Sequence, residues 1–315
     1  MLLKADTAFS GQTIGRPAQM IVGGSRAWIT DRSGDPYIHL IDLATKRLIA
    51  SFGVTGDGPG DFQNTVGLSF RPGDTTAPWT GDVSLFRVTR LSPPGDSTRI
   101  ASISLVDVGF AAGFVWLTRN SLLTLGDFDT NRVRLSDSSG KTLAVYPGQL
   151  VGGDSIPAVV RRDLGMGVIS CGDAQGHAAT VYVGAGRIDL HDSTGRVVGE
   201  AAVPFPTNGE FTKNAAGKWR ASDVWRYYAA CAASPRSVYA LFAGYRTDKK
   251  PQDAVGIAAF SVHVFDWAGK LTGVFRLEHP ASAIAVSGDS LLYAIGEEDA
   301  NLYRYRLPAL SKVVQ

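Results

Sequence analysis

The sequence predicts an all-β chain in which four-stranded units repeat around a central axis. Three observations support this prediction. Short runs that alternate apolar and polar residues recur between turn clusters along nearly the whole chain, and helical periodicity is almost absent. A phrase made of a strand, Asp, two residues, Gly and a basic residue occurs at 133–141, 188–196 and 262–270. Finally, 36 glycines among 315 residues are typical of a chain with many turns.

The repeated phrase predicts a β-hairpin. Asp137, Asp192 and Asp266 are expected to start the turn by accepting backbone hydrogen bonds, and the Gly three residues later is expected to take a positive φ. A looser copy at 38–46 has Thr45 in place of the Gly. Hairpins repeated at this spacing are typical of radial architectures such as propellers.

Six groups of strands follow one another along one domain that spans residues 1–315. They cover residues 18–52, 65–106, 108–146, 159–203, 223–277 and 283–307. The last group supplies only three strands, and residues 2–9 are the only unassigned run that can provide a fourth. The chain therefore predicts a six-bladed β-propeller with four antiparallel strands per blade, closed by the N-terminal strand joining the last blade.

Composition narrows the range of partners. A net charge of +2 without a Lys/Arg-rich tract gives no case for nucleic acid or an anionic membrane, and no apolar run approaches the length that membrane insertion needs. Closure removes the open edge between the first and last blades, so we expect a monomer. Cys171 and Cys231 end equivalent inner strands and are too few for a disulfide framework, so we expect two buried small apolar residues.

One segment resembles a known family. Residues 49–62, IASFGVTGDGPGDF, resemble the Gly-x-Gly-Pro-Gly-Glu/Asp-Phe signature that joins consecutive blades in NHL-type and TolB-like six-bladed β-propellers. Its glycines allow a crowded reversal, Pro59 stiffens it, and Phe62 is expected to bury its ring between blades. The signature covers blade 1, and blade 2 departs from the pattern because 83–87 and 99–104 lack the Asp-x-x-Gly phrase.

The resemblance implies a bacterial protein of the periplasm or the extracellular space. It transfers no catalytic residue, because a fold does not determine a function.

Ligands of propellers usually bind where loops lead into the innermost strands. The two segments at 158–171 and 218–230 are rich in Arg and aromatic residues, and they belong to consecutive blades. Guanidinium groups and aromatic rings recognise planar or anionic groups. The predicted ligand-binding residues are Arg161, Arg162, Trp219, Arg220, Trp225, Arg226 and Tyr227. The alternative is that Arg and Asp satisfy each other while aromatic residues, Trp225 and Tyr228 above all, fill the core between blades.

Catalytic and metal-binding signals are sparse. No Gly-x-Ser-x-Gly elbow occurs, and the candidate general bases are His279, Asp163 and Asp223. The histidines lack metal-ligand spacing, so neither a metal site nor a cofactor is predicted. Residues 127–131 and 297–301 suit Ca²⁺ better, although 127–131 lacks the later Gly and Glu of a calcium loop, and a solvated turn is the favoured interpretation.

Three functions follow from these features. The first is a ligand-binding propeller that recognises a small anionic or aromatic molecule, or a peptide, at the mouth of its central channel. The second is a hydrolase of esters, lactones, or phospho- or sulfo-esters at the same channel, where arginines would stabilise developing negative charge. The third is a protein-interaction scaffold that uses an insertion at 246–255.

Overall fold

The computed structural model describes residues 1–10, 14–32, 34–92, 102–104, 111–128, 131–147, 168–203, 210–217, 219–223, 225–246, 259–296 and 298–309. Within these ranges all regular structure is β, and none of it is a helix that could cross a bilayer.

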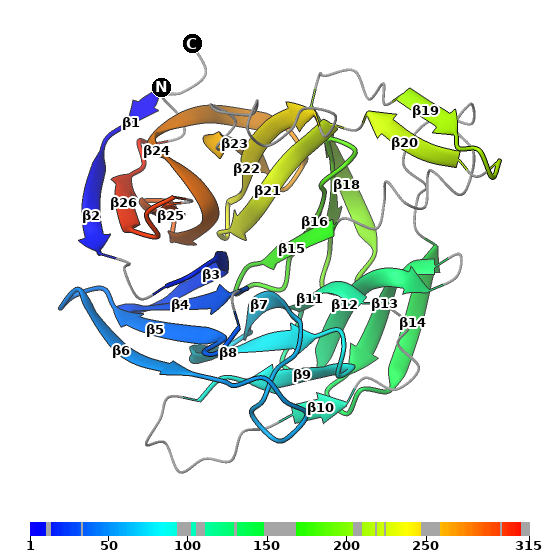
Figure 1. Cartoon of the computed structure of the whole chain (residues 1–315), viewed down its shortest axis with the longest axis horizontal. Helices are drawn as coiled ribbons and strands as arrows, with labels where there is room; N and C mark the ends of the chain where they lie inside the picture. The colour runs from blue at the N-terminus through cyan, green and yellow to red at the C-terminus, as the bar shows by residue number, and fades with distance from the viewer. Residues whose placement is uncertain are drawn as a thin grey trace.

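The strands group into antiparallel sheets that surround a central axis (Figure 1). Blade 1 contains β3 (Pro17–Gly23), β4 (Arg26–Asp31), β5 (Ile38–Asp42) and β6 (Arg47–Phe52). Blade 2 contains β7 (Thr65–Arg71), β8 (Asp74–Asp82), β9 (Arg87–Arg90) and β10 (Ser102–Ser104). Blade 3 contains β11 (Ala111–Trp116), β12 (Ser121–Phe128), β13 (Asn131–Asp137) and β14 (Thr142–Pro147). Blade 4 contains β15 (Val168–Gly172), β16 (Ala178–Tyr182), β17 (Arg187–His191) and β18 (Val197–Ala202).

The last two blades share a strand. Blade 5 contains β21 (Trp225–Ala233), β22 (Ser237–Arg246), β23 (Ala259–Asp266) and the first part of β24 (Leu271–Ser287). The second part of β24 is the inner strand of blade 6 and pairs with β25 (Leu291–Gly296), which pairs with β26 (Leu302–Arg306). Blades 5 and 6 therefore form one continuous sheet.

The N-terminus closes the ring, as the sequence predicted. β2 (Ala5–Phe9) pairs antiparallel with β26 as the outer strand of blade 6, and β1 (Leu2–Leu3) pairs parallel with β24 (Figure 1). The Arg304 guanidinium lies 3.1 Å from the Asp6 carboxylate across the β2–β26 pair. The predicted six-bladed propeller, closed by its N-terminal strand, is confirmed.

The predicted hairpin turns are present in blades 3, 4 and 5. In blade 3, Asp137 Oδ1 accepts hydrogen bonds from the backbone N–H of Ser139 (2.8 Å) and of Lys141 (3.0 Å), and Gly140 has a φ of 88°. Asp192 and Asp266 begin equivalent turns.

Blade 1 builds this turn differently from the prediction. Asp42 Oδ1 accepts from the N–H groups of Ala44 (2.9 Å) and Thr45 (2.8 Å), as a turn-starting Asp should. The positive φ of 56° falls on Lys46, however, so Thr45 does not stand in for the Gly. The turn is one residue longer, because Asp42 pairs with Arg47 whereas the N–H of Asp137 donates to the carbonyl of Lys141.

Apolar side chains on facing blades form the core. Phe62 is buried among Trp28, Ile38 and Leu40 of blade 1 and Leu68 of blade 2, so its predicted position between blades is confirmed. Burying such a ring stabilises the fold by roughly 1.5–3 kcal/mol.

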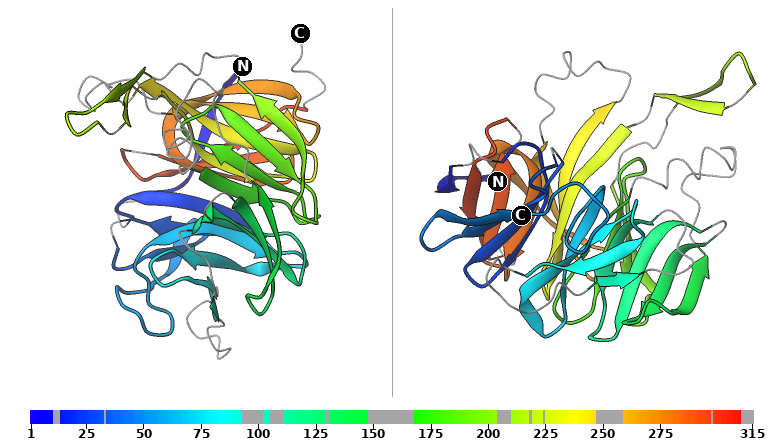
Figure 2. Two further views of the ribbon diagram at one scale, coloured as in Figure 1. Left: turned by 90° about the vertical axis from the view of Figure 1, so that its right-hand side faces the viewer. Right: turned by 60° about the horizontal axis from the view of Figure 1, so that its bottom comes forward.

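A two-stranded hairpin stands apart from the blades. β19 (Glu210–Lys213) pairs with β20 (Trp219–Asp223), and Figure 2 shows the hairpin projecting beyond blades 4 and 5.

Candidate functional site

The inner strands of the propeller surround a cavity of about 850 Å³ along the axis. Its wall is made by β3, β7, β15, β21 and the second part of β24. This volume lies within the range of about 300–1,000 Å³ that is usual for small-molecule sites. The axial channel is therefore the candidate site.

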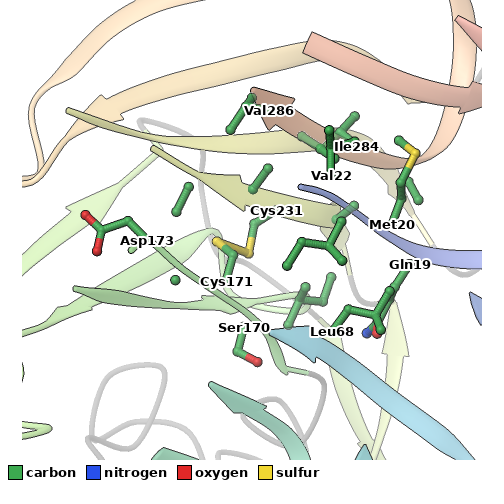
Figure 3. A pocket seen from close by; sticks show the side chains of 18 of the residues that line it. Gln19, Met20, Val22, Leu68, Ser170, Cys171, Asp173, Cys231, Ile284 and Val286 are labelled. Atoms are coloured by element: carbon green, nitrogen blue, oxygen red, sulfur yellow. A yellow bond between two sulfur atoms is a disulfide. The ribbon is translucent and has the colours of Figure 1, made fainter. Parts of the chain in front are cut away.

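Small side chains keep the channel open. β21 contributes Ala229, Ala230 and Ala232 to the wall, and β24 contributes Ala283 and Ala285. Larger apolar residues lie between them, and Figure 3 shows Met20, Val22, Leu68, Ile284 and Val286 around the hollow. A wall of this kind favours an apolar body in the ligand.

A disulfide bond crosses the wall between blades 4 and 5. Cys171 on β15 and Cys231 on β21 are joined, with their Cα atoms 5.8 Å apart (Figure 3). The expectation of two separate apolar cysteines was wrong. Equivalent positions on the inner strands of consecutive blades face each other, and their separation falls in the range that a disulfide spans.

The two ends of the channel differ. Every inner strand starts at the same end of the channel, and we call that end the start mouth. It is lined by Pro17, Arg32, Val168, Arg226 and Ala281. The opposite end is the end mouth, lined by Arg71, Asp173, Ser234 and Gly288. The N–H of Arg32 donates to the Arg16 carbonyl (2.8 Å), which places Arg32 beside the first residue of β3.

Two arginines lie at the start mouth. The side chains of Arg32 and Arg226 are exposed, and within the described part of the chain neither guanidinium has a hydrogen-bond or carboxylate partner. Since no described residue occupies their donors, these donors can bind an anion.

Charged groups at the end mouth are occupied by protein partners. The Asp173 side chain is 0% exposed; its Oδ1 accepts from the N–H groups of Gln175 (2.8 Å) and His177 (2.9 Å), and its Oδ2 contacts His177 Nδ1 (2.9 Å). Arg71 Nε donates to the Arg119 carbonyl, and the Arg71 guanidinium lies 4.8 Å over the Trp116 ring. The charged groups of the end mouth therefore stabilise the fold.

Two polar atoms in the channel wall have no partner among the described residues. They are Oε1 of Gln19 on β3 and Oγ of Ser282 on β24. Such atoms are rare in folded proteins, and each calls for an explanation. Both side chains rotate freely about a terminal bond and could present a donor or acceptor to a molecule in the channel.

The structure brings only part of the predicted ligand cluster to the channel. Arg226 lines it, whereas Tyr227 is 1% exposed in the core between blades 4 and 5. Tyr228 is also 1% exposed in that core, as the alternative interpretation expected, and it borders the channel as well. Trp219 lies on the projecting β19–β20 hairpin, with Lys213 Nζ 5.1 Å over its ring. Arg161 and Arg162 lie outside the described residues, as do the side chains of Arg220 and Trp225.

Sequence reasoning missed Arg32. It could have been predicted from its position: Arg32 directly follows the second strand of blade 1, which ends on the side of the sheet where the inner strands begin.

None of the predicted general bases lies in the described channel wall. His279 is partly buried, with its ring stacked 4.1 Å from that of Tyr303. Asp163 lies outside the described residues, and Asp223 is described only by its backbone in β20. The described residues contain no group of three His, Cys, Asp or Glu side chains arranged to hold a metal ion.

Comparisons with known proteins agree with this architecture. The profile of TolB-like 6-blade propeller-like proteins matches residues 3–289. No curated protein sequence matches the chain.

Solved structures show the same fold at low sequence identity. Streptogramin B lyase is 12% identical over 97% of this chain and 98% of its own, with a TM-score of 0.59. Hydrazine synthase from Kuenenia stuttgartiensis is 13% identical over 94% of this chain and 97% of its own, with a TM-score of 0.52. Since the family profile covers most of the residues, the chain belongs to the TolB-like six-bladed propeller family.

Proposed function

We propose that this propeller binds a small organic anion in its central channel. The anionic group would lie at the start mouth against Arg32 and Arg226, and an apolar or aromatic body would extend between the alanine-rich walls. The observation that supports this most directly is a pair of guanidinium groups at the rim of an apolar cavity, neither of which has a partner among the described residues.

The free energies of the available interactions favour binding of an anion at this mouth. A hydrogen bond to a charged group contributes about 1.5–3 kcal/mol, and a guanidinium can offer two parallel donors to a carboxylate, sulfonate or phosphate. Apolar surface removed from water adds about 25 cal/mol per Å². The partnerless atoms of Gln19 and Ser282 would supply the hydrogen bonds that orient the ligand.

The test uses 8-anilinonaphthalene-1-sulfonate, an anionic aromatic probe whose fluorescence rises in apolar sites. We expect saturable binding that weakens about tenfold in Arg32→Gln and in Arg226→Gln, equivalent to roughly 1.4 kcal/mol each. Ala229→Trp should abolish binding, because Ala229 is an exposed residue of the channel wall and the indole would fill the cavity.

The matched control is Arg236→Gln, which removes the same charge near the end mouth. Arg236 is 82% exposed and 3.8 Å from Asp289, so its loss should leave probe affinity unchanged. Binding that survives both Arg32→Gln and Ala229→Trp would contradict the proposal.

The described channel wall does not favour hydrolysis of the ligand. Ser170 is a wall hydroxyl on β15, and its Oγ donates to the Phe114 carbonyl (2.9 Å) rather than to a base. The insertion proposed for a scaffold lies outside the described residues beyond Arg246.

We further infer an oxidising compartment such as the periplasm or the extracellular space. The Cys171–Cys231 disulfide supports this, because such bonds persist where glutathione and thioredoxin do not reduce them. Alkylating protein taken from its native cells under denaturing conditions should add no thiol label before reduction and two labels after it.

A further inference from the structure

Blade 1 carries three hydrogen-bonded side chains that the channel does not use. Ser51 Oγ lies 2.8 Å from His39 Nδ1, and His39 Nε2 lies 3.2 Å from Asp31 Oδ2. Ser51 is on β6, His39 on β5 and Asp31 at the end of β4. His39 and Ser51 are direct cross-strand partners, so their side chains leave the sheet on the same face.

The carboxylate sets the tautomer of the histidine. Asp31 already accepts hydrogen bonds from the N–H groups of Gly15 (2.6 Å) and Arg16 (2.9 Å), which hold it as an oriented acceptor. An ionised carboxylate only accepts, so His39 Nε2 carries the proton that it donates to Asp31. The Nδ1 lone pair is then left to accept the Ser51 hydroxyl.

The environment of His39 suits a general base. Burial lowers the pKa of its imidazole, while the hydrogen bond and the charge of Asp31 oppose that shift. The side chain is 1% exposed, and the ring is neutral at pH 7. Asp31 orients it and can stabilise the imidazolium that forms when it takes a proton.

Ser51 is accessible, and a backbone donor lies beside it. It is exposed on β6, the outermost strand of blade 1, which pairs on one side only. Tyr37 N–H donates to the Gly53 carbonyl (3.0 Å), and hydrogen-bonded pairs alternate along an antiparallel ladder. The N–H of Phe52 therefore points to the free edge, where it can stabilise an oxyanion next to the serine.

Other blades show which part of this group the fold itself requires. Asp82 of blade 2 occupies the place of Asp31 and accepts from the N–H groups of Gln63 (2.6 Å) and Asn64 (3.1 Å). Thr89 stands two residues beyond the partner of Asp82, where blade 1 has His39. The carboxylate is thus a repeated structural feature, whereas the histidine is not.

A second histidine at the equivalent position of its hairpin does not form the same Ser–His–Asp contacts. His263 precedes its turn Asp by three residues, as His39 does, but its Nδ1 contacts the hydroxyl of buried Tyr228 (3.2 Å). Within the described residues, the histidine of blade 1 is the one that links an exposed serine to a buried carboxylate.

We propose that Ser51, His39 and Asp31 form a Ser–His–Asp triad that hydrolyses carboxylic esters with a short acyl group. Ser51 Oγ adds to the ester carbonyl carbon while its proton moves to His39 Nδ1. The alkoxide leaves with that proton as the alcohol, and the acyl group stays on Ser51. Water then loses a proton to His39, attacks the acyl carbon and releases the acid, returning the proton to Ser51.

The substrate class follows from the position of Ser51. It stands on the outermost strand of blade 1 and does not line the channel, so the acyl group would lie against an exposed sheet edge, which favours a short group. The reaction is also independent of the anion site, because Arg32 and Arg226 lie at the channel mouth.

A fluorophosphonate probe tests the nucleophile, because it phosphonylates an activated serine and releases fluoride. We expect one adduct per chain, located by mass spectrometry in the peptide that contains Ser51, and none in Ser51→Ala. The matched control is Ser139→Ala: Ser139 is also exposed, but its hydroxyl bonds to Asp137 (2.6 Å) instead of a histidine. Folded protein without an adduct, or an adduct that persists in Ser51→Ala, overturns the proposal.

A second pair of variants tests the base. In Ser51→Cys the thiol lies beside His39, and in Ser139→Cys it lies beside a carboxylate. We expect iodoacetamide to alkylate Ser51→Cys at least tenfold faster, because a neighbouring base raises the thiolate fraction. Equal rates would show that His39 does not activate the residue at position 51. Turnover of p-nitrophenyl acetate should be lost in Ser51→Ala and retained in Ser139→Ala.

Discussion

The two mouths of the channel contain similar residue types in opposite states. Both carry arginine, yet Arg71 at the end mouth lies over Trp116 and donates to a carbonyl, whereas Arg226 at the start mouth has no described partner. Asp173 at the end mouth satisfies three donors. Partnered charges contribute to the stability of the fold, and unpartnered exposed charges remain available to a ligand.

The comparison teaches that residue type alone does not identify a site. Substitutions at the end mouth should change stability and leave binding intact, and those at the start mouth should do the reverse. Two of the predictions below concern junctions between blades, and two test the division between the mouths directly.

The disulfide should have the largest effect on stability. It closes a loop of 60 residues between neighbouring inner strands, and restricting the unfolded chain in this way is worth about 4 kcal/mol. Urea unfolding with and without reductant should show this loss, and the Cys171→Ser/Cys231→Ser double variant should not respond to reductant. A loss below about 1 kcal/mol would mean that the blades hold this junction without the bond.

Asp173→Ala should destabilise the protein by about 2–3 kcal/mol, because three donors then lose a buried acceptor. Its affinity for the anilinonaphthalene probe should not change. Arg226→Gln gives the mirror result, with weaker binding and a free energy of unfolding within about 0.5 kcal/mol of the parent. If both variants lose stability, the division between the mouths is wrong.

Gly269→Ala should destabilise by about 2 kcal/mol, since an added Cβ would meet the Glu200 carbonyl oxygen of blade 4 at 2.3 Å and the φ is 85°. Gly217 on the projecting hairpin is the control: its φ is 73° and nothing lies within 4 Å, so only the backbone strain of about 1 kcal/mol remains. Thermal unfolding of the two variants separates packing from strain.

Ionic strength should have the smallest effect of the four, and that effect is on the affinity of the probe. Raising the ionic strength from about 0.1 to 1 M shortens the screening length from about 10 to 3 Å, so probe binding at the exposed start mouth should weaken by about threefold. The Arg32→Gln/Arg226→Gln double variant should lose most of this dependence. A salt effect of equal size in that variant would place the anion elsewhere.

Local patterns in the sequence predicted the fold well. The turns at Asp137, Asp192 and Asp266 depend on residues within four positions of one another, so the chain alone determines them. Closure by residues 2–9 followed from a missing strand in the last group. The exception is Lys46, whose positive φ reflects a longer turn that no Gly marked.

The sites were harder to predict because they join residues from separate strands. Ser51, His39 and Asp31 come together through the register of β4, β5 and β6, and no spacing rule marks that group. Cys171 and Cys231 did carry a signal, since both end inner strands of consecutive blades. Part of the predicted arginine cluster lies outside the described residues, so its contribution to the start mouth stays a prediction.

Closure by the first strand also determines the order in which the molecule can be completed. Asp6 leaves the ribosome before its partner Arg304, which follows 298 residues later. Until β26 has been synthesised, the strand at 5–9 therefore has no pairing partner in its own chain. During that time it can pair with a folded β26 on a neighbouring chain. A crowded, fast-translating cell should produce rings closed by exchanged first strands, linking separate molecules through the final blade.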